Sequence, residues 1–132
     1  MVCLHCGSET KVNNSRHQKK RNQVWRRREC LECHALFTTE EIVQFSNSLR
    51  VLNNSKMSVF SRDKLFLSIY ESCKHRKRAI TDATSLTESV IARLISQHSN
   101  GNIDSDSIVQ ITLVILNRFD KVSAIHYQSY HS

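Results

Sequence analysis

Apolar residues in the second half of the chain recur at the spacing of helices. Leu65, Ile69 and Cys73 lie four positions apart, which predicts one helix face. Ser61 precedes them, and serine is a common residue at the N-cap of a helix. Further apolar stripes cover about residues 81–98, 104–119 and 122–130. The segment 104–119 is apolar almost all round, so we expect it at the centre of a helical bundle.

Extended segments are predicted before these helices. Residues 24–28 and 35–39 combine β-branched, aromatic and long side chains, as short strands commonly do. Residues 49–52 and 56–59 form a second extended pair, and residues 53–55, with the sequence Asn-Asn-Ser, suit a tight turn between them. The second pair therefore predicts a β-hairpin.

The two halves differ in composition and together indicate an α+β fold. We expect a small β domain over residues 1–45 and a mostly α-helical domain with a short β-hairpin over residues 46–132. A domain as short as the first buries a limited core, so it needs additional stabilisation such as a bound metal.

The composition is that of a folded protein, because 39% of the 132 residues are hydrophobic and 23% are charged. No apolar run approaches the roughly 18–20 residues that span a membrane. The first residues lack the charged-then-apolar order of a signal peptide. We therefore expect a cytoplasmic protein with no membrane partner.

Positive charge is concentrated near the N-terminus. Residues 1–39 contain eight Lys or Arg against three Asp or Glu, whereas residues 40–132 contain eleven against nine. A small basic module favours a polyanionic partner such as nucleic acid, although a basic surface that only aids solubility is the alternative. Other basic residues lie near the predicted end of the first helix, where the helix dipole favours cations: Lys74, Arg76, Lys77 and Arg78.

Two Cys-x-x-Cys pairs predict a metal site. Cys3 and Cys6 form the first pair, and Cys30 and Cys33 form the second after 23 intervening residues. Four thiolates suit one tetrahedral Zn²⁺, and such a closed site is structural rather than catalytic. Alternative ligands, which two complete pairs make unnecessary, are His5, His17 and His34. Cys73 lies on an apolar stripe, and we expect it in the core.

The segment between the cysteine pairs is strongly basic. Arginine offers planar, forked donors for phosphates and guanine edges. On a strand, alternation would place Arg26 and Arg28 on one face and Arg27 on the other. Trp25 has two open roles, packing on the domain or stacking on a base or sugar. The candidate DNA contacts are Arg16, Lys19, Lys20, Arg21, Trp25, Arg26, Arg27 and Arg28.

A set of motifs extends along nearly the whole chain. The first half contains Cys3-x-x-Cys6-Gly7, Lys11-Val12, Ser15-Arg16, Arg26-Arg27-Arg28-Glu29-Cys30-Leu31-x-Cys33 and Phe37-Thr38-Thr39-Glu40. The second half contains Phe60-x-x-x-Lys64-Leu65 and Asp120-Lys121-Val122, with Ile125, Tyr127 and Ser129. In this order the motifs resemble the NrdR-type transcriptional repressors of bacterial ribonucleotide reductase genes.

The resemblance implies a function for each domain. The N-terminal domain would be a zinc ribbon that binds double-stranded DNA, and the C-terminal domain an ATP-cone that senses ATP and dATP. Nucleotide would change the state of a homo-oligomer, which would repress transcription at paired operator boxes. Such a protein would be nucleoid-associated when on DNA.

The resemblance also implies a nucleotide pocket whose residues are altered here. Family cones carry a Lys-Arg pair that holds phosphates, and alignment back from Phe60 places Leu52 and Asn53 at those positions. Ser55 and Ser58 stand where the family has Gly and Glu. Two lost charged hydrogen bonds, at about 1.5–3 kcal/mol each, would weaken triphosphate binding by roughly two to four decades. The candidate nucleotide contacts are Val51, Leu52, Asn53, Lys56, Lys64, His126 and Tyr127.

Two other functions are compatible with the sequence. One is a zinc-ribbon adaptor that binds RNA or a protein machine, and the other is a regulator of other genes whose cone no longer binds nucleotide. RNA recognition uses stacking aromatics, and the ribbon offers only Trp25 and Phe37, which favours DNA. The sequence contains no P-loop and no Ser/His/Asp set, so we do not expect an enzyme.

Overall fold

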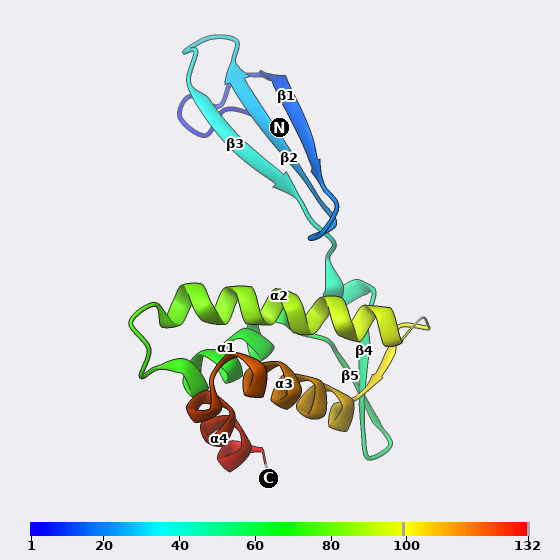
Figure 1. The fold of residues 1–132 in the computed structure, drawn as a ribbon. Coiled ribbons are helices and arrows are strands. Elements are labelled where there is room, and N and C mark those ends of the chain that lie inside the picture. Colours follow the sequence, from blue (N-terminus) through cyan, green and yellow to red (C-terminus); the bar gives the residue numbers. More distant parts are fainter. Residues whose placement is uncertain (99, 132) are drawn as a thin grey trace. The chain divides into compact units, whose positions relative to one another are not determined.

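The computed structural model describes residues 1–98 and 100–131, which form two compact units (Figure 1). The first unit is Met1–Val43 and the second is Gln44–Ser132. The first consists of strands and turns, whereas the second combines helices with short strands, so the predicted α+β fold is confirmed. None of the helices in the described residues has the length and apolar character needed to cross a membrane.

The first unit is an antiparallel sheet with strand order β1-β2-β3. Its strands are β1 (Thr10–Gln18), β2 (Gln23–Cys30) and β3 (Leu36–Glu41). The sequence pattern does not predict β1, because its residues are almost all polar and exposed and show no apolar alternation. Its extended form depends on the hydrogen-bonded ladder with β2, in which Arg16 pairs with Trp25 and Thr10 with Cys30.

The second unit contains a three-stranded sheet with strand order β5-β4-β6. After the 3₁₀ helix η1 (Phe45–Asn47), the strands are β4 (Arg50–Asn53), β5 (Lys56–Val59) and β6 (Asn102–Asp104). β4 and β5 form the predicted hairpin, with Asn54 and Ser55 at φ values of 48° and 71° in its turn. β6 pairs in parallel with β4 and was not predicted, because so short a strand carries no pattern of its own.

The helices of the second unit are α1 (Arg62–Cys73), α2 (Ala79–Gln97), α3 (Ser105–Phe119) and α4 (Lys121–Tyr130). Ser61 caps α1 as predicted, since its Oγ accepts a hydrogen bond from the backbone N–H of Lys64 at 3.3 Å. The placement of Lys77 and Arg78 at the end of the first helix was wrong. α1 ends at Cys73, and these two residues directly precede α2.

The core of the second unit lies among the four helices and the sheet. α1 and α3 each pack against both α2 and α4. The buried apolar residues are Leu49, Phe60, Leu65, Ile69, Cys73, Ala83, Leu86, Val90, Ile91, Leu94, Ile103, Ile111, Leu116, Ala124 and Tyr127. The expectation that residues 104–119 lie at the centre was wrong. Val114 and Phe119 of α3 are 43% and 39% exposed, because α3 packs through one face only.

Candidate metal centre and nucleic-acid interface

Two tight turns bring four cysteines of the first unit together. In the first turn, the backbone N–H of His5 donates to Cys3 Sγ at 3.3 Å. In the second turn, the backbone N–H groups of Glu32 and Cys33 donate to Cys30 Sγ, each at 3.4 Å. These amide donors orient the sulfur atoms of Cys3 and Cys30.

The four sulfur atoms form one cluster with the dimensions of a zinc site. The Sγ atoms of Cys3, Cys6, Cys30 and Cys33 all lie within 4.8 Å of one another. Cys3 Sγ is 3.7 Å from Cys33 Sγ, and Cys6 Sγ is 3.4 Å from Cys30 Sγ. Thiolates around a tetrahedral Zn²⁺, with Zn–S bonds of about 2.3 Å, lie about 3.8 Å apart. Within the described residues the cluster contains none of the alternative ligands His5, His17 and His34.

Within the cluster of four sulfur atoms the pKa values of Cys6 and Cys33 shift in opposite directions. Hydrogen bonds from Ser8 lower the pKa of Cys6 to about 6. The backbone N–H of Ala35 lowers the pKa of Cys33, but contacts with the other sulfur atoms, chiefly Cys30, and desolvation raise it to about 12. Four thiolates at this distance repel one another, and a bound Zn²⁺ compensates their charge. The donor set therefore fits one structural Zn²⁺ that closes the sheet and leaves no open coordination position.

The arginines of β2 are held by hydroxyl groups on the neighbouring strands. Arg26 Nη1 donates to Ser15 Oγ at 3.0 Å, Arg27 Nη1 to Thr38 Oγ1 at 3.1 Å, and Arg28 Nε to Thr39 Oγ1 at 3.2 Å. Arginine has five N–H donors, so one such bond orients the guanidinium and leaves the others for a ligand. The sequence alone does not reveal these hydroxyl partners, because they become neighbours of the arginines only through the register of the sheet.

The ladder places the arginines on both faces of the sheet. Arg26 pairs with Ser15 and Thr39, whereas Arg27 pairs with Asn14 and Thr38 in the next row. Since adjacent rows project to opposite faces, Arg26 and Arg28 share one face and Arg27 lies on the other. No single flat surface of the sheet therefore presents the whole set.

Glu29, the acidic residue of β2, has polar and basic partners on β1. Asn13 Nδ2 donates to Glu29 Oε2 at 2.9 Å, and Lys11 Nζ lies 3.7 Å from the same oxygen. The hydrogen bond from Asn13 and the charge of Lys11 hold the pKa of Glu29 below its usual value. Because Asn13 and Lys11 already bind this carboxylate, its negative charge reduces the positive potential around the arginines only a little.

The remaining candidate DNA contacts belong to the same hairpin. Arg16 lies on β1 opposite Trp25 of β2. Trp25 is partly buried, and its partner on the other side, on β3, is Glu40. Three basic residues lie in the exposed turn between β1 and β2: Lys19, Lys20 and Arg21. All eight predicted residues are therefore carried by one two-stranded element.

A separate pocket of about 290 Å³ lies in the second unit. It is lined by Val51, Ser58, Val59, Phe60, Ser61, Lys64, Leu65, Ser68, Ser105, Ile108, Val109, Tyr127 and His131. Among these described residues Lys64 is the one Lys or Arg. The pocket groups three of the seven nucleotide candidates, namely Val51, Lys64 and Tyr127.

The other nucleotide candidates lie outside this lining. Leu52, Asn53 and Lys56 are exposed on the hairpin. Nδ1 of His126 lies 3.4 Å from the carbonyl oxygen of Ser72, and its ring contacts another histidine instead of the pocket. Tyr127 is 1% exposed, so it is a core aromatic that also closes one side of the pocket.

The strands, turns and clustered thiols of the first unit define a zinc-ribbon protein. A family model for the N-terminal domain of NrdR-like transcriptional repressors matches residues 1–41. A transcriptional repressor NrdR from Finegoldia magna is 34% identical over 131 residues, which cover 98% of this chain and 86% of that protein. One from Opitutus terrae is 32% identical over 130 residues, covering 98% of this chain and 85% of that protein.

The chain belongs to the NrdR family of transcriptional repressors. The resemblance found in the sequence motifs is thereby confirmed over almost the whole chain, and the chain groups with regulators rather than enzymes.

Proposed function

We propose that the protein represses transcription, with ribonucleotide reductase genes as its targets, by binding operator DNA through the zinc ribbon. The observation that carries this proposal is the set of three β2 arginines, each oriented by a hydroxyl of a neighbouring strand. In this proposal the protein acts on DNA in the cytoplasm. The four-cysteine zinc site supports the arginines indirectly, because it fixes the sheet on which they stand.

In this proposal the β2 arginines contact base edges and the basic turn contacts the DNA backbone. A bidentate arginine on a guanine edge contributes about 1–3 kcal/mol of discrimination between bases. Basic side chains of the exposed turn at residues 19–21 suit phosphates, which give affinity without sequence preference. Arginines on both faces suit a sheet whose strand or edge enters a groove, with the two faces toward opposite groove walls.

Repression at paired operator boxes requires more than one chain. A single ribbon covers few base pairs, so specificity requires at least two ribbons on adjacent boxes. Apolar side chains exposed on α3 and α4 supply a surface for self-association: Val114, Phe119, Val122 and Ile125. The second unit is therefore the proposed assembly domain.

The pocket of the second unit is the proposed nucleotide site. Lys64 supplies one cation for phosphates, and the apolar lining suits an adenine ring. Because Leu52 and Asn53 replace the pair of cations expected by the resemblance, the affinity for triphosphate is low. Control of assembly by ATP or dATP then requires high nucleotide concentrations.

Binding to promoter DNA tests the proposal. The double variant Arg26→Gln/Arg28→Gln and the single variant Arg27→Gln are compared with wild type on duplexes from upstream of ribonucleotide reductase genes and on random duplexes. Lys11→Gln is the matched control for the single variant, since it also removes one positive charge from the ribbon, and Lys11 lies against Glu29. We expect both arginine changes to lower promoter affinity at least tenfold and the control to change it little.

Fluorescence anisotropy at several salt concentrations provides the measurement. Loss of each phosphate contact reduces the slope of log affinity against log salt by about 0.9. Arginine variants that bind promoter DNA as tightly as wild type would overturn the proposal. Preference for single-stranded RNA over the duplex would favour the adaptor function instead.

A further inference from the structure

A basic loop joins α1 to α2 in the second unit. Residues 74–78 have the sequence Lys-His-Arg-Lys-Arg, and no Asp or Glu occurs between residues 72 and 81. Lys74, Lys77 and Arg78 are exposed. Together with Tyr70 and the first residues of α2, they line an open hollow of about 450 Å³ whose charged lining residues are all basic.

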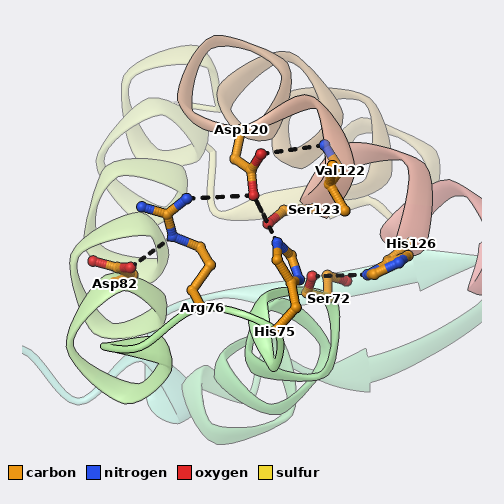
Figure 2. Close-up of polar contacts among 8 residues, drawn as sticks. All are labelled: Ser72, His75, Arg76, Asp82, Asp120, Val122, Ser123 and His126. Atoms are coloured by element: carbon orange, nitrogen blue, oxygen red, sulfur yellow. Dashed lines mark hydrogen bonds and ion pairs between the residues drawn. The ribbon is translucent and has the colours of Figure 1, made fainter.

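His75 and Arg76 anchor this loop through contacts with acidic residues of the same unit (Figure 2). Arg76 Nε donates to Asp82 Oδ2 at 2.8 Å, and its Nη1 lies 3.4 Å from Asp120 Oδ2. His75 Nε2 lies 2.9 Å from the same Asp120 oxygen. The Arg76 guanidinium also stacks over the Phe119 ring, 4.4 Å from its centroid. The middle of the loop is therefore fixed to α2 and to the start of α4.

The positive charges of Lys77 and Arg78, unlike that of Arg76, are not balanced by an acidic partner among the described residues. Within the described part of the chain, neither forms an ion pair, whereas Lys74 lies 2.7 Å from Glu71. Both residues directly precede α2, at the end of a helix where its dipole disfavours cations. Local stability thus does not explain two adjacent cations at this position, whereas an anionic ligand in the hollow does.

We propose that Lys77 and Arg78, with Lys74 beside them, form a phosphate-binding site separate from the ribbon. Arginine binds phosphate oxygens with two parallel donors and lysine supplies a compact charge. The hollow shares no lining residue with the apolar pocket, so it is also separate from the proposed nucleotide site. The inference rests on the proposed function for its main ligand, the DNA backbone, and free polyphosphate has the same chemistry.

The test compares the full-length wild type with Lys77→Gln/Arg78→Gln. Arg50→Gln/Arg93→Gln is the matched control, since it removes the same charge from the same unit outside the loop. If the ligand is the DNA backbone, the loop variant lowers the salt slope by about 1–2 and the affinity at 0.15 M salt roughly tenfold. The loss is equal for promoter and random duplexes, because a backbone contact carries no sequence information.

A second titration uses inorganic tripolyphosphate. If the site serves free polyphosphate, the loop variant loses tripolyphosphate binding at least tenfold and retains the wild-type salt slope on DNA. A loop variant that matches the control in both titrations overturns the inference, provided that its unfolding midpoint shows it is folded. Wild type that binds no duplex would refute the proposed function alone, and the tripolyphosphate titration would still decide this site.

Discussion

Asp120 connects three segments of the second unit through one carboxylate. Its Oδ1 accepts from the backbone N–H of Val122 at the start of α4, and its Oδ2 accepts from Ser123 Oγ at 2.8 Å. The same oxygen faces His75 and Arg76 of the loop before α2. The hydrogen bonds from His75 and Ser123 hold the pKa of Asp120 well below its usual range.

Asp120→Ala should therefore destabilise the second unit in a pH-dependent way. At pH 7 we expect a loss of about 2.5–4 kcal/mol, from a helix cap worth about 1 kcal/mol and a charged hydrogen bond worth about 1.5–3 kcal/mol. Because the folded pKa is lowered, this stability is complete above the unfolded pKa of about 3.9 and is lost as the pH falls below it.

Urea unfolding followed by helical circular dichroism at pH 7, 5 and 3.5 measures the effect. The difference between wild type and Asp120→Ala should be constant from pH 7 to 5 and smaller at pH 3.5. Asp106→Ala, an exposed acid in the first turn of α3, is the control and should cost less. A constant difference at all three pH values would contradict the role of the charge.

The two kinds of buried cysteine should respond differently to substitution. Cys30→Ser should abolish zinc binding and unfold residues 1–43, because the small ribbon depends on the metal for its folding. Cys73→Ser, in the core of the second unit, should lower stability but retain about one zinc per chain. Metal analysis and the helical signal of both proteins check this. A ribbon that stays folded without metal would refute it.

At the scale of elements, sequence patterns predicted those parts that carry their own local signal. Apolar periodicity located α1 to α4 within a few residues, and turn chemistry located the β4–β5 hairpin. β1 and β6 could not be predicted in this way, since β1 is held mainly by hydrogen bonds to β2 and β6 is too short to carry a pattern. The cysteine spacing predicted the metal cluster, but the register that pairs Arg26 with Ser15 required the assembled sheet.

The turn of the β4–β5 hairpin leaves room for a stabilising change. Ser55 has a φ of 71°, a left-handed conformation that glycine adopts without steric cost. Asn-Gly is the preferred pair in a two-residue hairpin turn, so Ser55→Gly should stabilise the second unit by about 0.5–1 kcal/mol. Ser58→Gly, within β5, should destabilise it by a similar amount. Thermal unfolding of both variants measures the difference, and a lower melting temperature for Ser55→Gly would contradict it.

At the scale of the whole molecule, nucleotide binding is predicted to be weak. Calorimetry with ATP and dATP on the full-length protein should give dissociation constants in the high micromolar to millimolar range. The reason is that Lys64 is the one Lys or Arg in the described pocket lining. Lys64→Ala should weaken binding by a further factor of about 10, the loss of one charged hydrogen bond. Tight binding that survives Lys64→Ala would place the nucleotide elsewhere.

Self-association is predicted to depend on the exposed apolar residues of α3 and α4. Ile125 is 64% exposed, and Ile125→Asp should shift the protein toward monomer by placing a charge in a desolvated contact. Leu67→Asp is the control, since Leu67 is 55% exposed and belongs to a different helix, α1. Sedimentation velocity at micromolar protein distinguishes the two, and equal behaviour of both variants would locate the contact elsewhere.

The parallel pairing of β4 with β6 has a consequence for the speed of folding. The hairpin of β4 and β5 can form locally, whereas the pairing of Arg50 with Asn102 joins positions that α1 and α2 separate in the sequence. Closing so long a segment slows the approach to the transition state, as it does in proteins rich in distant contacts. Gly101 makes that closure sterically feasible, because a Cβ there would lie 2.8 Å from the carbonyl oxygen of Ser48. During synthesis, the sheet of the second unit therefore stays incomplete until most of the chain has left the ribosome.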